Sequence, residues 1–305
     1  MSASGILSIN KPAGWTSFDV VALVRKRTGV RKVGHAGSLD PSATGVLLVC
    51  LGQAARISEY LMQLPKVYRA RVMLGVATDT YDSEGQVTFE GDAGTVSEER
   101  LRDALARFAG EVEQTPPAFS AVKVGGQRAY RLARMGRETR LSPRMVRVDR
   151  IELVAYEPPY AELEVECGKG TYIRSLAHDL GQELGCGAHL AALTRTRVGP
   201  FVLERAVSPQ EVEEAVAAGR WQEMMYPMAY GLDHLPAVVV GGEEREALRH
   251  GGSLRSVAAP AEPGGGPCRA ETEDGELLAI VKYDAEAGVW RPQKVFTGAA
   301  DASEG

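Results

Sequence analysis

A glycine-rich loop between two apolar segments holds the residues of this chain whose types best suit chemistry. The segment GHAGSLDPSATG, residues 34–45, contains one histidine, His35, and one aspartate, Asp40. Pro41 biases Asp40 toward an extended backbone, and the glycines permit the close approach of a ligand. The loop is therefore suited to presenting an ionised carboxylate at the edge of a sheet. The structural alternative is an Asx turn that only shapes the loop.

The spacing of glycines and cysteines argues against several other kinds of site. The loop matches neither GxxxxGK[ST] nor GxGxxG, the common phosphate-cradling patterns. The cysteines form no CxxC pair, which argues against a zinc knuckle and against a disulfide framework; they are Cys50, Cys167, Cys186 and Cys268. We expect reduced, buried thiols, no metal and no cofactor.

The net charge of −5 argues against a nucleic-acid partner when it is taken over the whole chain. The charges are unevenly distributed, however. Residues 1–200 carry 26 Lys and Arg against 22 Asp and Glu, whereas residues 201–305 carry 9 against 18. Nine basic and two acidic side chains fall within 123–150, where five arginines recur every three residues: Arg128, Arg131, Arg134, Arg137 and Arg140. This arginine-rich segment is suited to gripping phosphates, and a solvated, salt-bridged helix is the alternative.

The hydrophobic pattern predicts an α/β chain in which strands and helices alternate irregularly. The continuously apolar run at 46–52 predicts a strand buried on both faces, directly after the Asp40 loop. Further strands are expected at 5–12, 67–76, 86–89, 118–124, 145–155 and 160–167. Helices are expected after the capping residues Ser17, Ser97 and Ser208, and in a segment that ends at Gly185.

The length of 305 residues is a soft prior for two domains, and the pattern changes near residue 235. We expect a catalytic domain over 1–235, a small β-rich domain over 236–298 and a disordered tail over 299–305. No apolar run approaches the roughly 18 residues of a membrane span, and the N-terminus lacks the order of a secretory signal. We therefore expect a cytoplasmic protein with no membrane partner.

Six segments, in order over residues 5–205, resemble one known family. The resemblance is to the bacterial tRNA pseudouridine-55 synthases, the B family of RNA pseudouridine synthases. It is carried by INKPAGWTS, GHAGSLDPSATGVLLVCLG, KVYRARVMLGVATDTYDSEG, PPAFSAVKVGGQRAYRLAR, GKGTYIRSLAHDLG and CGAHLAALTRTRVGPF. Six ordered segments are far more specific than any single short motif.

The resemblance implies a fold, a reaction and a partner. The fold is a mixed, largely antiparallel sheet in the catalytic domain, followed by a small C-terminal β-barrel that resembles a PUA domain. In the reaction, a uridine in the T-loop of tRNA is detached at N1, turned and rejoined through C5 without a cofactor. The partner is the T-arm of tRNA, with no protein partner and a monomeric enzyme that also assists tRNA folding.

The resemblance assigns the chemistry to three residues. Asp40 matches the essential nucleophile, Arg174 the arginine that pairs with it, and Tyr68 the tyrosine that packs on the base and removes the C5 proton. Attack at C1′, attack at C6 and deprotonation of C2′ remain open as routes. Without the resemblance, Arg174 is expected to be a solvated arginine on a helix face, and Tyr68 a core aromatic of a strand.

Other residues receive binding roles from the same resemblance. His35 matches a histidine that holds the RNA loop open, and Tyr172 and Leu193 match residues lining the uridine pocket. Lys11 and Arg56 match or approximate basic positions near the RNA. The arginine-rich segment at 123–150 matches the insertion that clamps the T-loop.

Two other classes of function remain open from the sequence. One is a non-catalytic RNA-binding or RNA-folding module in which Asp40 is structural. The other is a glycosidase-like hydrolase, which normally needs a second carboxylate. Asp79 and Asp82 are candidates for that carboxylate, although a turn with a surface role is the preferred interpretation for both.

Overall fold

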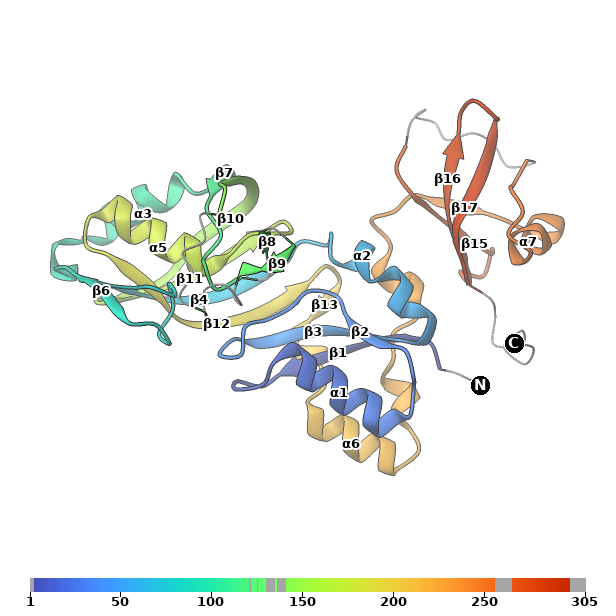
Figure 1. Ribbon diagram of the computed structural model, residues 1–305, viewed down its shortest axis with the longest axis horizontal. Helices are drawn as coiled ribbons and strands as arrows, with labels where there is room; N and C mark the ends of the chain where they lie inside the picture. The colour runs from blue at the N-terminus through green and yellow to red at the C-terminus, as the bar shows by residue number, and fades with distance from the viewer. Residues whose placement is uncertain are drawn as a thin grey trace.

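The computed structural model describes residues 3–296 apart from 121, 125, 130–134, 136–140 and 256–264. A nine-stranded mixed sheet and a smaller four-stranded sheet dominate it (Figure 1). The large sheet has the order β1-β3-β12-β4-β11-β10-β7, with β2 beside β3 and β13 beside β12. Only the β3–β12 pairing in it is parallel. The predicted α/β class with a largely antiparallel sheet is confirmed.

The strands of the large sheet are β1 (Gly5–Lys11), β2 (Val33–His35), β3 (Thr44–Leu51), β4 (Lys66–Leu74), β7 (Gly110–Gln114), β10 (Arg144–Glu157), β11 (Tyr160–Cys167), β12 (Ala188–Val198) and β13 (Phe201–Val202). Two small hairpins lie outside it: β5 (Val76–Thr78) with β6 (Val87–Glu90), and β8 (Lys123–Val124) with β9 (Gln127–Arg128). The strand expected over 118–124 is thus only the two residues of β8, within the part of that range that the structure describes.

Two pairs of helices cover the two halves of the large sheet (Figure 1). α3 (Glu98–Ala106) and α5 (Ile173–Leu184) pack against β4, β11 and β12, whereas α1 (Ser17–Thr28) and α6 (Pro209–Ala217) pack near β1 and β3. A short α2 (Ser58–Leu61) follows the 3-10 turn η1 (Gly52–Ile57). Within the ranges given above, no helix is long and apolar enough to cross a membrane.

Strand β3 is buried on both faces, as its continuous apolar run predicts. Its even-numbered side chains, from Val46 to Cys50, enter the core that η1 and α2 cover. Its odd-numbered side chains, from Leu47 to Leu51, enter the core beneath α1 and α6. Side chains alternate between the faces of a strand, so a strand between two cores must be apolar at every position. This strand holds the C-terminal end of the Asp40 loop rigidly.

The ends of the helices follow the sequence signals except at two positions, the start of α1 and the end of α3. Helix α1 is capped by Thr16 in a capping box with Asp19 rather than by the expected Ser17. The Ser17 hydroxyl instead accepts from the backbone N–H of Leu39 at 2.9 Å, which ties the start of α1 to the Asp40 loop. Helix α3 ends at Ala106, and Gly110, the expected stop, begins β7.

Strand β12 is the central strand that the sequence analysis did not identify. It runs between β3 and β4 and pairs with both, and it carries Leu193 and Arg195 into the middle of the sheet. Its C-terminal half reads Thr-Arg-Thr-Arg, a polar pattern that resembles an exposed segment rather than a buried strand. The pairing with β3 brings this half of β12 against the end of the Asp40 loop.

The C-terminal part of the chain forms its own sheet. Its elements are β14 (Ala237–Val239), α7 (Gly242–Arg249), β15 (Cys268–Glu271), β16 (Leu277–Asp284) and β17 (Val289–Val295). The sheet order is β14-β15-β16-β17, and Leu248 and Trp290 lie in its core. Leu277, Ile280 and Phe296 pack instead into the core with α2. The expected tail at 299–305 lies outside the described residues.

We expect Gly45→Ala to destabilise the fold more than an ordinary glycine substitution. An added Cβ would lie 2.2 Å from the carbonyl oxygen of Arg195, and φ is +101° at this position. Left-handed strain of about 1–2 kcal/mol and overpacking of about 1–3 kcal/mol together predict a loss of about 3 kcal/mol in the free energy of unfolding, measured by urea titration.

The matched control for this substitution is Gly29→Ala at the end of α1. Gly29 has φ +72° but open space around its Cβ position, so only the strain of about 1–2 kcal/mol applies. Equal losses in the two variants would contradict the close contact between β3 and β12.

Candidate active site

The Asp40 loop is held at several points along its backbone. Gly14 donates its N–H to the carbonyl of Pro41 at 2.9 Å, and Ala43 donates to the carbonyl of Asp40 at 3.1 Å. The preceding residue, Leu39, is buried and bonded to Ser17. The Asp40 side chain nevertheless keeps 43% of its surface exposed. The loop thus presents a carboxylate to solvent from a fixed backbone.

Arg174, in the first turn of α5, is the cation that faces Asp40. Its Nε lies 2.9 Å from Asp40 Oδ2, as an ion pair without the alignment of a hydrogen bond. Its terminal nitrogens donate to the carbonyls of Thr80 at 3.1 Å and Phe119 at 2.9 Å. The Arg174 side chain is only 6% exposed. The guanidinium is therefore fixed by the protein, and its charge holds the Asp40 carboxylate beside it.

Asp82 is a second carboxylate on the same guanidinium. Its Oδ2 lies 3.4 Å from Arg174 Nη1, and its Oδ1 accepts from the Thr80 hydroxyl at 2.6 Å. The expectation of a surface role is wrong for Asp82, because this side chain is buried against Arg174. Asp79 remains exposed and closes the turn by accepting from the N–H of Gln86 at 2.8 Å.

A cleft opens beside this ion pair and brings several predicted residues together. Its walls include Asp40, Ala43, Asp82, Arg174, Leu190 and Leu193. Leu193 lies on an apolar wall of this cleft, beside the carboxylate. Tyr172 is not among the residues that line the cleft. The Gln114 side chain holds the Tyr172 backbone through two hydrogen bonds. The centre of the Tyr172 ring lies 5.1 Å from the Arg144 guanidinium carbon.

Tyr68, in β4, lies opposite Arg195 of β12 in the register of the sheet. Burial raises the pKa of Tyr68, and the Asp40 charge raises it further, while the positive charge of Arg195 acts in the opposite direction. The phenol is therefore neutral at neutral pH. A carboxylate and a fixed guanidinium meet at the cleft, and a half-buried phenol lies on the strand next to β12, an arrangement that suits nucleophilic attack followed by proton transfer.

Comparison with known proteins identifies the family. Residues 25–173 match the family described as TruB family pseudouridylate synthase (N terminal domain), and residues 174–235 match the tRNA pseudouridylate synthase B C-terminal domain. The tRNA pseudouridine synthase B of Symbiobacterium thermophilum is 48% identical over 81% of this chain and 82% of the relative. That of Dehalococcoides mccartyi is 42% identical over 96% of both chains. The chain belongs to the TruB family of pseudouridine synthases.

Solved structures agree with the TruB assignment. The crystal structure of a Cbf5-Nop10-Gar1 complex is similar with a TM-score of 0.77 and 29% identity, over 96% of this chain and 85% of that chain. An H/ACA RNP bound to a substrate RNA containing 2'-deoxyuridine is similar with a TM-score of 0.75 and 28% identity, over 96% of this chain and 85% of that chain. The TruB-family chain is an isomerase of this fold.

Lys11 of this TruB-family chain lies in a different setting from that expected of an RNA contact. It is fully buried, and its Nζ donates to the carbonyls of Pro12 at 2.9 Å, Trp15 at 2.7 Å and Pro41 at 3.1 Å. Burial lowers the pKa of Lys11 to about 8, and the Asp40 charge acts against this effect. All three ammonium protons are used inside the protein, so Lys11 braces the Asp40 loop from beneath.

Arg56 lies in η1 against the C-terminal sheet rather than in the cleft. Its guanidinium donates to the Gln53 side chain and to the Val295 carbonyl, and it lies 5.3 Å from the Phe296 ring centre. His35, at the end of β2, has a buried Nδ1 without a hydrogen-bond partner among the described residues. Burial, assisted by the Arg195 charge, lowers the pKa of His35 and favours the neutral imidazole.

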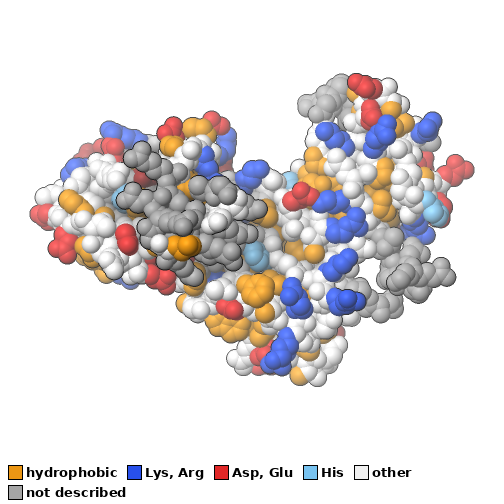
Figure 2. Space-filling model, in the orientation of Figure 1, with side chains coloured by type: hydrophobic (Ala, Val, Ile, Leu, Met, Phe, Trp, Pro, Cys, Tyr) orange, Lys and Arg blue, Asp and Glu red, His pale blue; other side chains and the backbone are white. Residues whose placement is uncertain are grey.

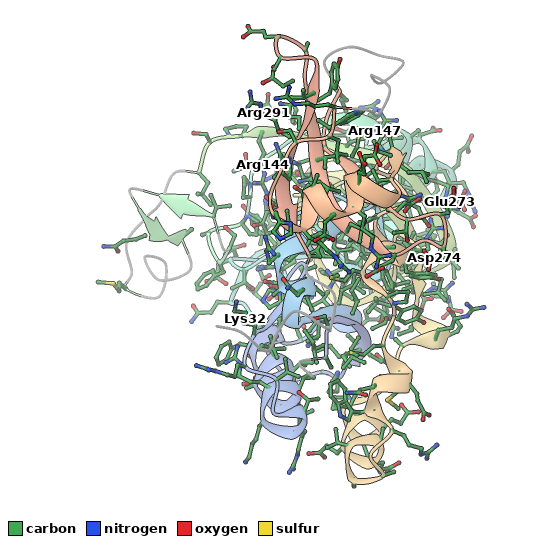
Figure 3. All side chains as sticks on the ribbon, turned by 90° about the vertical axis from the view of Figure 1, so that its right-hand side faces the viewer. Lys32, Arg144, Arg147, Glu273, Asp274 and Arg291 are labelled. Carbon is green, nitrogen blue, oxygen red and sulfur yellow. The ribbon has the colours of Figure 1, made fainter. Side chains whose placement is uncertain are left out.

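The arginine-rich segment is only partly described. Arg128 lies in β9, whereas Arg131, Arg134, Arg137 and Arg140 lie outside the described residues. Basic side chains gather on the face shown in Figure 2, from the C-terminal sheet toward α1. Figure 3 places Arg144 and Lys32 toward the side of the β8–β9 hairpin, and Glu273 and Asp274 toward the opposite side. Some of the acidic side chains of residues 201–305, including Glu273 and Asp274, thus lie away from the basic face.

Sequence reasoning missed Gln114 and Arg195 as parts of the site, and it named Asp82 only as a candidate second carboxylate for which a surface role was preferred. None of them stands in a spacing that signals chemistry, and each acts through a partner distant in sequence. The turn after β5 brings Asp82 to the cleft, whereas Gln114 holds the Tyr172 backbone and Arg195 the Asp40 loop without lining the cleft. No cluster of three His, Cys, Asp or Glu side chains suited to a metal occurs in the described part of the chain.

We expect the Lys11 titration to appear in the pH dependence of stability. The pKa of Lys11 is lowered to about 8 from 10.5, so the unfolded chain binds more protons between these pH values. This lysine's contribution to the free energy of unfolding therefore increases as the pH rises from 8 to 10.5. The free energy of unfolding of wild type and of Lys11→Met is measured by urea titration at pH 7.5 and at pH 9.5. Between these pH values, that of wild type should rise relative to that of the variant, by less than the ~1.4 kcal/mol per pH unit that one full proton gives. A difference between the two proteins that is independent of pH would contradict this burial.

Proposed function

We propose that this protein converts uridine 55 in the T-loop of tRNA to pseudouridine, with Asp40 as the nucleophile and the target base flipped into the cleft. The observation that carries the proposal is the ion pair between the exposed Asp40 carboxylate and the buried Arg174 guanidinium at the cleft wall. The names of the bacterial relatives, tRNA pseudouridine synthase B, support the substrate.

The proposed reaction uses each group in a defined step. The N1–C1′ bond of the uridine breaks, the detached base turns, and a bond forms between C5 and C1′ while the C5 proton leaves and N1 gains a proton. Asp40 supplies the carboxylate for attack at C1′ or C6 or for removal of the C2′ proton. Arg174 holds this carboxylate, and Leu193 and Tyr68 provide the apolar and aromatic walls that a flipped base needs. Tyr68 releases its phenolic proton, which reaches N1 through solvent, and the phenolate then accepts the C5 proton, so that the neutral phenol is restored.

Binding of the tRNA involves the parts of the chain outside the cleft. We propose that the arginine-rich segment at 123–150 clamps the T-arm, with His35, Tyr172 and Arg56 acting near the RNA as the resemblance implies. Lys11, which is buried, supports the Asp40 loop instead of contacting the RNA. The catalytic domain spans 1–235, and the 236–298 domain resembles a PUA domain that reaches the acceptor end. The substrate places the protein in the cytoplasm, where it acts as a monomer and also assists tRNA folding.

Asp40→Asn should abolish isomerisation while leaving tRNA binding within about twofold. The substitution keeps the shape of the side chain but removes the charge that attacks the nucleotide and pairs with Arg174. The measurement is release of tritium from a T-arm transcript labelled at uridine C5, together with equilibrium binding of the same transcript.

The control is Asp103→Asn, an exposed carboxylate on α3, which should release tritium at the wild-type rate. Tritium release by Asp40→Asn at the wild-type rate would remove the nucleophile from the proposal. Binding without any modification by wild type would favour the RNA-binding module, and free uracil would favour the hydrolase.

The clamp makes a separate prediction about salt. Each arginine that neutralises a phosphate adds about 0.7–0.9 to the slope of log affinity against log salt. Reversing Arg131, Arg134 and Arg137 to glutamate should therefore weaken tRNA binding and flatten this slope by about 2–3. Filter binding at several salt concentrations measures both. Reversal of Arg102 on α3 and of Arg107 at its C-terminal end is the control, and an unchanged slope in the clamp variant would refute the clamp.

A further inference from the structure

Arg195 is a fully buried cation directly beneath the Asp40 loop. Only 1% of it is exposed. Its Nη2 donates to the Gly37 carbonyl at 3.1 Å, its Nη1 to the Ser38 carbonyl at 3.3 Å, and its Nε to the Val46 carbonyl at 2.7 Å. One guanidinium thus joins the backbone just before Asp40 to the strand that follows the loop.

The surroundings of Arg195 do not favour a buried positive charge. No carboxylate of the described residues lies within 4 Å of its nitrogens. Its charge instead contributes to the lowered pKa values of Lys11, Lys66 and His35. Removing an ion from water costs several kcal/mol, and neutral carbonyls alone offset this poorly. Stability alone is therefore a weak reason for an arginine at this position.

The strand register places Arg195 between the two groups that the proposed reaction uses. In β12 it lies opposite Gly45 of β3, at the end of the Asp40 loop, and opposite Tyr68 of β4. Directly opposed residues of an antiparallel pair project to the same face of the sheet, so Arg195 and Tyr68 are neighbours. The backbone of Arg195 lies so close to Gly45 that a Cβ added at Gly45 would come within 2.2 Å of the Arg195 carbonyl oxygen.

We propose that Arg195 is a positioning residue that holds the Asp40 loop and Tyr68 in one arrangement during the isomerisation. This inference rests on the proposed roles of Asp40 and Tyr68. The three carbonyl bonds fix the backbone from which Asp40 projects toward Arg174. The positive charge beside Tyr68 also favours the phenolate form of this side chain, whose oxygen accepts a proton from the base.

The test compares Arg195→Met and Arg195→Lys with Arg197→Met in the full chain. Arg197 lies two residues along the same strand, is half-exposed and pairs with Glu166 at 2.7 Å, so it controls for loss of an arginine from β12. Methionine fills much of the volume of the arginine stem without its charge or its donors. Lysine keeps the charge but cannot bond three carbonyls in the fork geometry of a guanidinium.

Single-turnover tritium release, tRNA affinity and the thermal midpoint are measured for each variant. We expect Arg195→Met to lose at least 30-fold in rate, with tRNA affinity within threefold and a thermal midpoint close to that of wild type. Arg195→Lys should recover part of the rate near neutral pH, where a lysine retains its charge and still favours the phenolate, and should lose this advantage as the pH rises. Arg197→Met should keep the wild-type rate.

Two results would overturn the inference. One is a folded Arg195→Met protein that reacts within threefold of wild type. The other is a rate loss matched by an equal loss of tRNA affinity, which a merely structural role would produce. If Arg195→Met fails to fold, Arg195→Lys decides by the same two criteria. An active Asp40→Asn protein would instead refute the proposed function, whereas an inactive Asp40→Asn beside a fully active Arg195→Met refutes only the role of Arg195.

Discussion

The contact between Arg174 and Asp40 is the interaction on which the site depends, and it needs partners from four parts of the chain. The carboxylate comes from the loop before β3, and the guanidinium from the first turn of α5. The Thr80 carbonyl and Asp82 come from the turn after β5, and the Phe119 carbonyl from the segment after β7. A guanidinium with one partner can rotate, whereas these contacts leave Arg174 a single orientation. The position of the Asp40 carboxylate beside Arg174 therefore depends on all four of these segments.

The order of the strands explains how such distant segments meet. Strand β12 lies between β3 and β4, so the end of the Asp40 loop and Tyr68 are separated by one strand. The parallel pairing of β12 with β3 covers only two register pairs, Thr194 with Thr44 and Arg195 with Gly45. A Cβ at Gly45 would prevent even this short pairing. The glycine thus lets the two halves of the large sheet join at the cleft.

Much of the fold and the centre of the site could be predicted from sequence, because their signals are local. The apolar run of β3, the cap at Ser208 and the left-handed Gly185 each depend on neighbouring residues. The family motifs identified Asp40 and Arg174, and the structure brings both to one cleft. Strand β12 was missed because its buried arginine and threonines have the pattern of a solvent-exposed segment. Lys11 and Asp82 carry charges that are expected at the surface, and only their distant carbonyl or guanidinium partners make their burial possible.

The distribution of charge around Asp40 reconciles an acidic protein with an anionic substrate. Lys11 and Arg195 are buried on the protein side of the loop, while Asp40 is the partly exposed charge above them. An approaching phosphate meets repulsion from Asp40, but the buried cations act through the less polar protein interior, where their field is screened less than that of a surface charge. Burial lowers the pKa of Lys11 to about 8, and added negative charge from RNA opposes that shift. The net charge of −5 therefore says little about this cleft, whose potential depends on a few positive charges held within hydrogen-bond distance of backbone carbonyls.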